Sequence, residues 1–380
     1  MDDDGPGGVR RPVPGDGGRA LRPDGARSDR ELQAADEPDG RAGPLSGGRR
    51  GAPWSRGADG GAVRTVGGVG PDGGPRFDGT VPHDGYRWWY VDALSADGRH
   101  GITIIAFIGS VFSPFYAWSR RRGPADPEQH CSLNVALYGR PKRWAMTERG
   151  RTKLTRSDNH LTIGASALHW DGTSLTIWIE EVTAPVPSRL SGVVTVTPRA
   201  LTRRSFTLDA GGRHRWSPIA PSATVTVAME RPGLSWSGTG YLDSNEGDRP
   251  LERDFSEWDW CRAPTKEGTI ILYNAVRRVG GRQDLALRID AAGAVEPFAP
   301  PPPARLPRTL WGLHPQTRCD ANAHPIVRQR LEDAPFYARS VIETRLGGER
   351  LQAVHESLVM DRFTAPWVQA MLPFRIPRAR

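Results

Sequence analysis

The sequence predicts an all-β protein of barrels or sandwiches. From Val81 onward, short runs rich in Trp, Val, Ile, Thr and Tyr alternate with Gly, Pro, Asp and Asn. Residues 174–179 and 224–227 alternate between apolar and polar with a period of two, the period of a half-buried strand. Helical periodicity is scarce, apart from a possible short turn near residues 365–371. Many short strands at regular spacing are typical of β-barrels and sandwiches.

The N-terminal segment differs in composition from the rest of the chain. Residues 1–74 hold 20 of the 44 glycines, with many Arg, Asp and Pro and almost no large apolar residues. Such a segment buries too little apolar surface to offset the entropy lost on ordering. We therefore expect residues 1–76 to form a disordered tail, to which we assign no function.

The remaining chain has room for two barrels in succession, with boundaries at residues 77–250 and 251–380. An acidic stretch falls after about nine strands, where one barrel would end and the next would begin, and such junctions favour ligand sites. The expected strands cover residues 87–93, 101–108, 132–138, 143–147, 175–181, 192–197, 224–230, 234–241, 258–262, 268–276, 284–289, 326–331, 337–346 and 350–359.

Composition narrows the functional classes. The chain of 380 residues carries a formal net charge of +8, so its body could attract anionic lipid. It shows no recognition helix or aromatic RNA-binding motif, which argues against a nucleic-acid partner. The chain opens Met-Asp-Asp-Asp-Gly, unlike a signal peptide, and its longest apolar run, 102–112, is about half of what spans a bilayer. We expect an intracellular protein, cytoplasmic or peripheral to the membrane.

No motif for a cofactor, metal or nucleophilic triad is present. The three cysteines, Cys131, Cys261 and Cys319, lack metal or redox spacing. The glycines of the tail follow no strand, so they do not form a phosphate-binding loop. No Gly-x-Ser-x-Gly elbow lies between a strand and a helix. We expect neither a cofactor nor a metal.

The acidic stretch that ends the first barrel is the strongest candidate site. Seven carboxylates lie between Asp243 and Asp259, among Trp236, Tyr241, Trp258 and Trp260. Carboxyls packed among aromatic faces lose solvation, which raises their pKa and keeps them protonated near neutral pH. The alternative is a charged inter-domain loop whose tryptophans belong to the core.

A second aromatic stretch covers residues 112–123. Tyr116 and Trp118 could line an apolar groove, with Arg120, Arg121 and Arg122 facing a lipid head group or a partner. The alternative is a wide loop with a charged tip.

Several motifs together resemble the bacterial carotenoid 1,2-hydratases, also called hydroxyneurosporene synthases. They are His83-Asp84-Gly85-Tyr86-Arg87-Trp88-Trp89-Tyr90, Phe112-Ser113-Pro114-Phe115-Tyr116-Ala117-Trp118, Asn134-Val135-Ala136-Leu137-Tyr138-Gly139, Trp144-Ala145-Met146-Thr147-Glu148-Arg149-Gly150 and Tyr241-Leu242-Asp243-Ser244-Asn245. The resemblance covers about residues 80–375. It implies two consecutive lipocalin-like antiparallel barrels and cofactor-independent addition of water to the terminal 1,2 double bond of acyclic carotenoids such as neurosporene or lycopene.

Residues and resemblance together give a mechanistic hypothesis. Asp243, its pKa raised by Trp236 and Tyr241, protonates carbon 2, and a water oriented by Asn245 or Glu246 adds to the tertiary cation at carbon 1. Asp259 is the alternative acid, although its place between two tryptophans on a strand could turn it outward. The rings expected to bind substrate and flank the cation are Tyr116, Trp118, Trp236, Tyr241, Trp258 and Trp260.

Two other functions fit the same features: a non-catalytic lipocalin-like carrier of a carotenoid or other lipid, and a polyene isomerase or pericyclase on the same scaffold. An apolar polyene substrate resides in membrane, so we also expect peripheral contact with anionic lipid through Arg120–Arg122 and the terminal Arg375, Arg378 and Arg380. The sequence gives no sign of an obligate protein partner.

Overall fold

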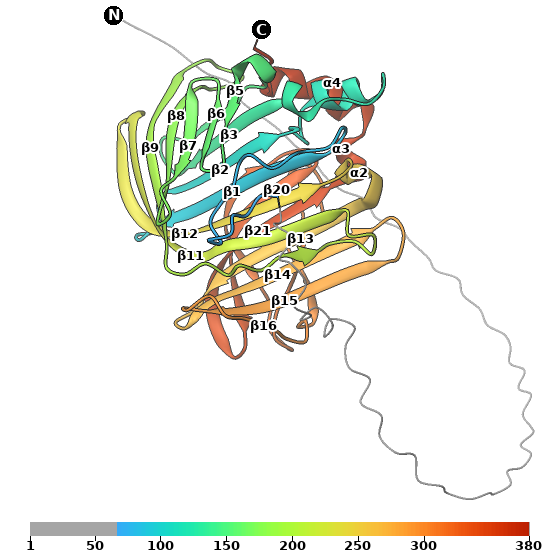
Figure 1. The fold of residues 1–380 in the computed structure, drawn as a ribbon. Coiled ribbons are helices and arrows are strands. Elements are labelled where there is room, and N and C mark those ends of the chain that lie inside the picture. Colours follow the sequence, from blue (N-terminus) through green and yellow to red (C-terminus); the bar gives the residue numbers. More distant parts are fainter. Residues whose placement is uncertain (1–66, 380) are drawn as a thin grey trace, which may run out of the picture. The chain divides into compact units, whose positions relative to one another are not determined.

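The computed structural model describes residues 67–379, which form two large antiparallel sheets and a few short helices (Figure 1). Residues 1–66, most of the expected tail, lie outside the described residues. Residues 67–76, at the end of that expected tail, contact the first sheet. The indole Nε1 of Trp89 donates to the Gly68 carbonyl at 3.0 Å, and that of Trp170 donates to Asp72 at 2.8 Å.

The first sheet has 12 strands. They are β1 (Tyr86–Ser95), β2 (Gly101–Ile108), β3 (Cys131–Tyr138), β4 (Arg143–Met146), β5 (Leu154–Arg156), β6 (His160–Ile163), β7 (Ser166–Trp170), β8 (Leu175–Val182), β9 (Arg189–Pro198), β10 (Phe206–Thr207), β11 (His214–Arg231) and β12 (Leu234–Gly247). Their order is β4-β3-β2-β1-β12-β11-β9-β8-β7-β6-β5, and β10 pairs with β11.

The first sheet curls around its own core. Leu133 on β3 and Leu161 on β6, from opposite parts of the strand order, belong to one buried cluster with Val91 and Val225. A sheet whose distant strands share one interior has the curvature of a barrel. Ile, Leu and Val side chains fill this interior, so the space within the first sheet is a packed core.

The second sheet has seven strands in the order β16-β15-β14-β13-β21-β20-β19. They are β13 (Phe255–Pro264), β14 (Gly268–Arg277), β15 (Arg282–Asp290), β16 (Val295–Pro297), β19 (Ile326–Asp333), β20 (Tyr337–Leu346) and β21 (Glu349–Val359). A separate pair, β17 (Pro303–Arg305) and β18 (Gln316–Arg318), lies between β16 and β19 in the chain.

The outer face of the first sheet packs against the second sheet. Trp88 and Tyr90 alternate with the inward-facing residues of β1 and form a second core with Trp258, Trp260 and Tyr273 of the second sheet. Because both its faces are covered, β12 is buried without a break from Gly240 to Gly247, whereas its first half alternates. Polar residues in that second half are therefore withdrawn from water.

Short helices complete the fold. They are α1 (Pro114–Arg120), α2 (Leu251–Asp254), α3 (Met360–Phe363) and α4 (Pro366–Arg375), with single 3₁₀ turns η1 (Pro127–Gln129) and η2 (Arg151–Lys153). In α4, Val368 and Leu372 are buried, whereas Trp367, Met371 and Phe374 are exposed. Over residues 67–379, no helix combines the length and apolarity needed to cross a membrane.

The predicted fold class, every expected strand and the C-terminal helical turn are confirmed. The short strands β5, β6, β7, β10, β16, β17 and β18 were not predicted, because runs of two to five residues carry little apolar periodicity. The stretch near residue 116, for which a wide loop was one of two interpretations, contains α1, which starts where Ser113 Oγ caps the Phe115 amide at 3.1 Å. The first sheet ends at Gly247 and the second begins at Phe255. The domain division into 77–250 and 251–380 remains a proposal.

Candidate active site

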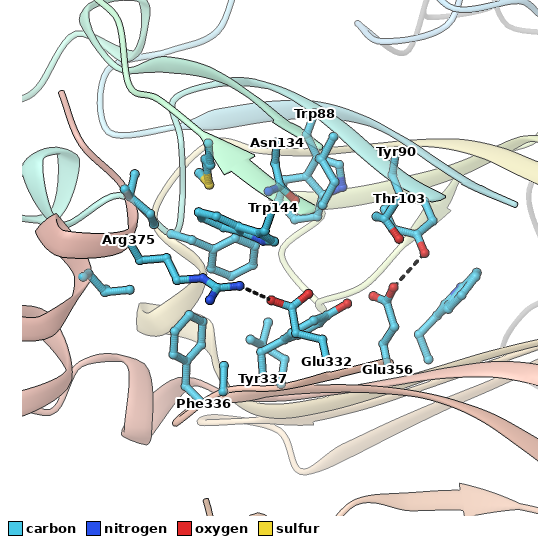
Figure 2. Close-up of a pocket in the computed structure, with 18 of the residues that line it drawn as sticks. Trp88, Tyr90, Thr103, Asn134, Trp144, Glu332, Phe336, Tyr337, Glu356 and Arg375 are labelled. Carbon is cyan, nitrogen blue, oxygen red and sulfur yellow. Dashed lines mark hydrogen bonds and ion pairs between the residues drawn. The ribbon is translucent and has the colours of Figure 1, made fainter. Parts of the chain in front are cut away.

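A large pocket lies between the outer face of the first sheet and the facing side of the second (Figure 2). Its empty volume is about 1250 Å³, part of it open to solvent. Rings from both sheets line it, among them Trp88 and Trp144 of the first and Trp258, Phe336 and Tyr337 of the second half of the chain. The walls are predominantly apolar, with a few polar groups, as in sites that bind apolar ligands.

Asp243 is the carboxyl at the centre of this site. It lies on β12 with only 4% of its surface exposed. Its Oδ2 accepts hydrogen bonds from the Trp216 indole and the Tyr241 hydroxyl, both at 2.8 Å. Burial raises the pKa of Asp243 to about 8, although both hydrogen bonds favour the carboxylate and lower the pKa. The carboxyl therefore keeps its proton at neutral pH.

Strand register sets a row of pocket residues beside Asp243. Tyr90 on β1 pairs with Asp243, and the row continues across the first sheet through Ile105 and Asn134 to Met146. All five line the pocket. Asn245, two residues along the same face of β12, places its Nδ2 3.4 Å from Asp243 Oδ1.

The second sheet presents a matching row. Tyr273 pairs with Trp260, Trp260 pairs with Glu356, and Glu356 pairs with Arg339, on four adjacent strands. The first three residues line the pocket. The Trp260 ring lies 5.1 Å from the Tyr241 ring, and the Tyr273 ring lies 5.1 Å from the Trp216 ring, centroid to centroid. Both donors to the Asp243 Oδ2 thus pack against this row.

Glu356 is held in an ion network between the sheets. Its Oε1 accepts from the Tyr90 hydroxyl at 2.6 Å, a contact visible in Figure 2, and from Arg339. Arg339 also donates to Asp92 at 2.9 Å, and Asp92 pairs with Arg262 at 2.7 Å. Burial raises the pKa of Glu356, and the charge of Arg339 opposes this rise. Two cations balance two carboxylates, so the network is paired internally.

Helix α4 forms one side of the pocket. Val368 and Leu372 face inward, and Arg375 lies over the Trp144 ring at 4.2 Å and pairs with Glu332 at 3.3 Å (Figure 2). Arg375 is exposed, Met371 lines the pocket and is also partly exposed, and the side chain of Phe374 turns outward. The pocket therefore opens to solvent beside this helix.

The structure brings together five of the residues named from sequence. Asp243, Asn245, Trp258 and Trp260 line the pocket, and the Tyr241 hydroxyl contacts Asp243. The expected cause of the raised pKa needs correction. Burial raises the pKa, whereas Tyr241 lowers it by donating to the carboxylate.

The structure does not bring the other named residues to this group. Glu246 lies on the opposite face of β12, where it pairs with Arg87 at 2.7 Å and Arg215 at 2.6 Å. Trp236 packs against the interior core of the first sheet. Tyr116 is buried with its hydroxyl on the Gly85 carbonyl at 2.7 Å, and Trp118 contacts Phe115 beside it in α1.

The alternative acid, Asp259, also points away from the pocket. Its neighbours Trp258 and Trp260 face the first sheet, so Asp259 lies on the other side of β13, as strand alternation predicted. It is buried there and accepts from the Gln316 amide at 3.2 Å. Burial raises its pKa to about 7. A raised pKa alone therefore does not identify the site.

Sequence reasoning missed Trp216, Tyr273 and Glu356. Trp216 opens the long strand β11, of which only residues 224–230 were expected. Tyr273 and Glu356 sat in correctly predicted strands, but nothing local indicated which strands pair. Trp88, Asn134 and Trp144 lay within the motifs of the family resemblance, which was the available signal for them.

The chain is similar to known proteins in sequence and in fold. The sequence model of the family Carotenoid hydratase CrtC matches residues 104–380. The acyclic carotenoid 1,2-hydratase of Thiocapsa roseopersicina is 55% identical, over 96% of this chain and 91% of that protein. That of Rubrivivax gelatinosus is 50% identical, over 98% of this chain and 93% of that protein. A solved Nitrosomonas europaea structure described as AttH, 15% identical, covers 72% of this chain and 92% of its own with a TM-score of 0.51, a likeness of fold alone.

Proposed function

This chain belongs to the carotenoid hydratase family, and on that premise we propose that it adds water across the terminal 1,2 double bond of an acyclic carotenoid such as lycopene or neurosporene. It acts as a hydro-lyase and yields a 1-hydroxy carotenoid. The observation that carries the mechanism is a buried carboxyl, that of Asp243, on the wall of an aromatic pocket, where burial raises its pKa to about 8.

Asp243 is the proton donor. With a pKa of about 8, about nine-tenths of the enzyme carries the proton on this group at pH 7. Transfer to carbon 2 leaves a tertiary cation at carbon 1 and a carboxylate on Asp243. The Trp216 and Tyr241 hydrogen bonds to Oδ2 stabilise that carboxylate, so they act most strongly as charge develops.

Ring faces stabilise the cation. Trp88, Tyr90, Trp258 and Trp260 line the pocket around Asp243, and each well-placed ring contributes roughly 0.5–2 kcal/mol to a nearby cation. The same apolar walls keep out stray nucleophiles. Of the two residues considered for orienting the water, Asn245 lies beside Asp243, whereas Glu246 is engaged by two arginines.

Labelled water tests this function against its alternatives. Incubation with lycopene in oxygen-18 water should place the label in a tertiary alcohol. A carrier would return lycopene unchanged, and an isomerase or pericyclase would return an unlabelled isomer. Either result would refute the hydratase assignment.

We further propose that the exposed face of α4 contacts the membrane that holds the substrate. Trp367, Met371 and Phe374 are 42%, 45% and 77% exposed, and Trp311 stacks on Trp367 at 6.0 Å. The inner face of the same helix lines the pocket. A polyene end leaving the bilayer at this helix would enter the site directly.

The arginines expected at this surface need revision. Arg120 is buried against Glu252 at 2.8 Å, and Arg378 pairs with Glu148. Arg121 and Arg122 are exposed just after α1, which packs beside α4, whereas Arg380 lies outside the described residues. Apolar contact supplies most of this attraction, and the exposed Arg121 and Arg122 add roughly 1 kcal/mol each near anionic lipid.

Vesicle flotation tests the surface. The protein should float with phosphatidylcholine vesicles, and more completely when phosphatidylglycerol is added. Phe374→Asp should reduce flotation with both. Val186→Asp, at a residue 76% exposed on the loop between β8 and β9, should float like the unmodified protein. Equal flotation of the Phe374 variant and the unmodified protein would contradict the assignment of this face.

A further inference from the structure

Trp260 and Tyr273 face Asp243 from the opposite sheet. They are direct cross-strand partners on β13 and β14, with side chains on the same face. Each packs against one of the two donors to the Asp243 Oδ2, at 5.1 Å in both cases. Both also line the pocket. The strand register therefore fixes one indole and one phenol opposite the acid.

The polar atoms of these two side chains have no hydrogen-bond partner among residues 67–379. The Trp260 indole Nε1 and the Tyr273 hydroxyl are both fully buried, as is the Asn245 Oδ1 on the facing strand. Buried polar groups without a partner carry a desolvation cost, and the three residues that bear these atoms line the same pocket. A single small polar molecule can satisfy all three, since buried waters make two to four hydrogen bonds.

We propose that Trp260, Tyr273 and Asn245 form the binding site of the water that attacks the carotenoid cation. This water site rests on the proposed hydratase function, and it assigns a role in that function to residues of the second sheet. Trp260 can only donate, the Asn245 oxygen can only accept, and the Tyr273 hydroxyl does either. A water that accepts from Trp260 and donates to Asn245 and Tyr273 keeps one lone pair for carbon 1.

The site completes a balanced addition. Asp243 gives its proton to carbon 2, and the held water forms the carbon–oxygen bond at carbon 1. The resulting protonated alcohol then loses one proton to the Asp243 carboxylate, which restores the acid. The sum is addition of one water, with no co-reactant. Trp260, Tyr273 and Asn245 are positioning residues, because none of them exchanges an electron pair with carbon.

Glu356 is a weaker candidate for holding this water. Its side chain also lines the pocket, but its Oε1 already accepts from Tyr90 and Arg339. The charge of that carboxylate is balanced within the ion network. Burial and the nearby carboxyls of Asp243 and Glu356 raise the pKa of Tyr273, so its phenol stays protonated and available as a hydrogen-bonding group.

The test separates proton transfer from water capture. In deuterated water, a cation that is formed but not captured loses a proton and returns as alkene with deuterium at carbon 2. Tyr273→Phe keeps the phenyl ring and loses only the hydroxyl, whereas Trp260→Phe keeps one six-membered aromatic ring and loses the pyrrole ring with its N–H. Each should lower hydration of lycopene by about tenfold, the effect of one lost hydrogen bond in the transition state, while deuterium exchange into recovered lycopene persists. The ratio of exchange to hydration should rise accordingly.

A matched control is available in Trp236→Phe, which also removes a buried indole N–H without a partner among the described residues, but in the interior of the first sheet. Its ratio of exchange to hydration should match that of the unmodified enzyme. An unchanged ratio in both site variants, or a parallel loss of exchange and hydration, would overturn the water site while leaving the hydratase function standing. An unmodified protein without hydration activity would instead refute the proposed function.

Discussion

The raised pKa of Asp243 predicts a specific pH dependence of hydration. The acid must carry its proton, so the rate should be constant below the pKa and fall above it. With a pKa of about 8, the rate at pH 9 should be about one-tenth of its plateau, and each further pH unit should cost another tenfold. The group is a general acid in free enzyme, so the apparent kcat/KM is the quantity that reports this pKa.

The fall in rate above the pKa forms the descending limb of the pH profile. Removing a hydrogen bond to the carboxylate should shift this limb along the pH axis in a known direction. The Tyr241 hydroxyl donates to Oδ2 at 2.8 Å and lowers the pKa, so Tyr241→Phe should raise the pKa of Asp243. A bond that favours the charged form by about 1.4 kcal/mol corresponds to one pH unit. The limb should therefore move from about pH 8 to about pH 9, even if the plateau also falls.

Initial rates with lycopene in detergent micelles, measured from about pH 6 to about pH 10, give both profiles. Circular dichroism at each pH confirms that the protein stays folded. A limb that stays fixed in Tyr241→Phe, or moves to lower pH, would show that another group controls the rate. A wild-type profile that stays flat above pH 9 would remove Asp243 as the acid.

Three further predictions concern carboxyls. Asp243→Asn should abolish product yet raise the thermal midpoint at pH 8 relative to the unmodified protein. The reason is that a folded-state pKa above the unfolded value costs stability as pH rises from about 4 to about 8. Calorimetry at pH 5 and pH 8 tests this, and an equal midpoint at pH 8 would contradict it. Glu246→Gln should lower stability by about 3 kcal/mol, because it leaves Arg87 buried with a weakened partner, while the descending pH limb stays in place; a shifted limb in rate measurements would tie Glu246 to the chemistry. Asp259→Asn should retain hydration of lycopene, since that carboxyl faces away from the pocket, and loss of turnover in a folded variant would reverse this assignment.

The sequence predicted the fold class, which is confirmed, and it singled out Asp243 as the candidate acid, because both predictions depend on local pattern. Alternation placed Asp259 opposite its flanking tryptophans, and the same rule separates Asp243 from Glu246, three positions apart on one strand. Proximity within the acidic stretch obscured that rule, and Glu246 was assigned to the site. Aromatic density misled in the same way at Tyr116, whose hydroxyl binds backbone.

The remaining site residues could not be predicted because they depend on non-local register. Glu356 reaches the site through the pairing of β13 with β21, and Asp243 through the pairing of β12 with β1, strands separated by about one hundred residues or more. A shift of either register by one residue would turn these side chains to the other face. Local periodicity does not determine which strands pair when they lie far apart in the sequence.

The arrangement of the two sheets explains why the acid lies outside the first barrel. Large aliphatic side chains fill the interior of that barrel, so a polyene has no room there. The outer face instead gains a second wall from β13, β14 and β21, which buries Asp243 without enclosing it in its own barrel. A carboxyl on an uncovered outer face would be solvated, would have an ordinary pKa and would be ionised at pH 7. The hydration chemistry that we propose therefore requires both sheets: the first positions Asp243, and the second removes the water that would ionise it.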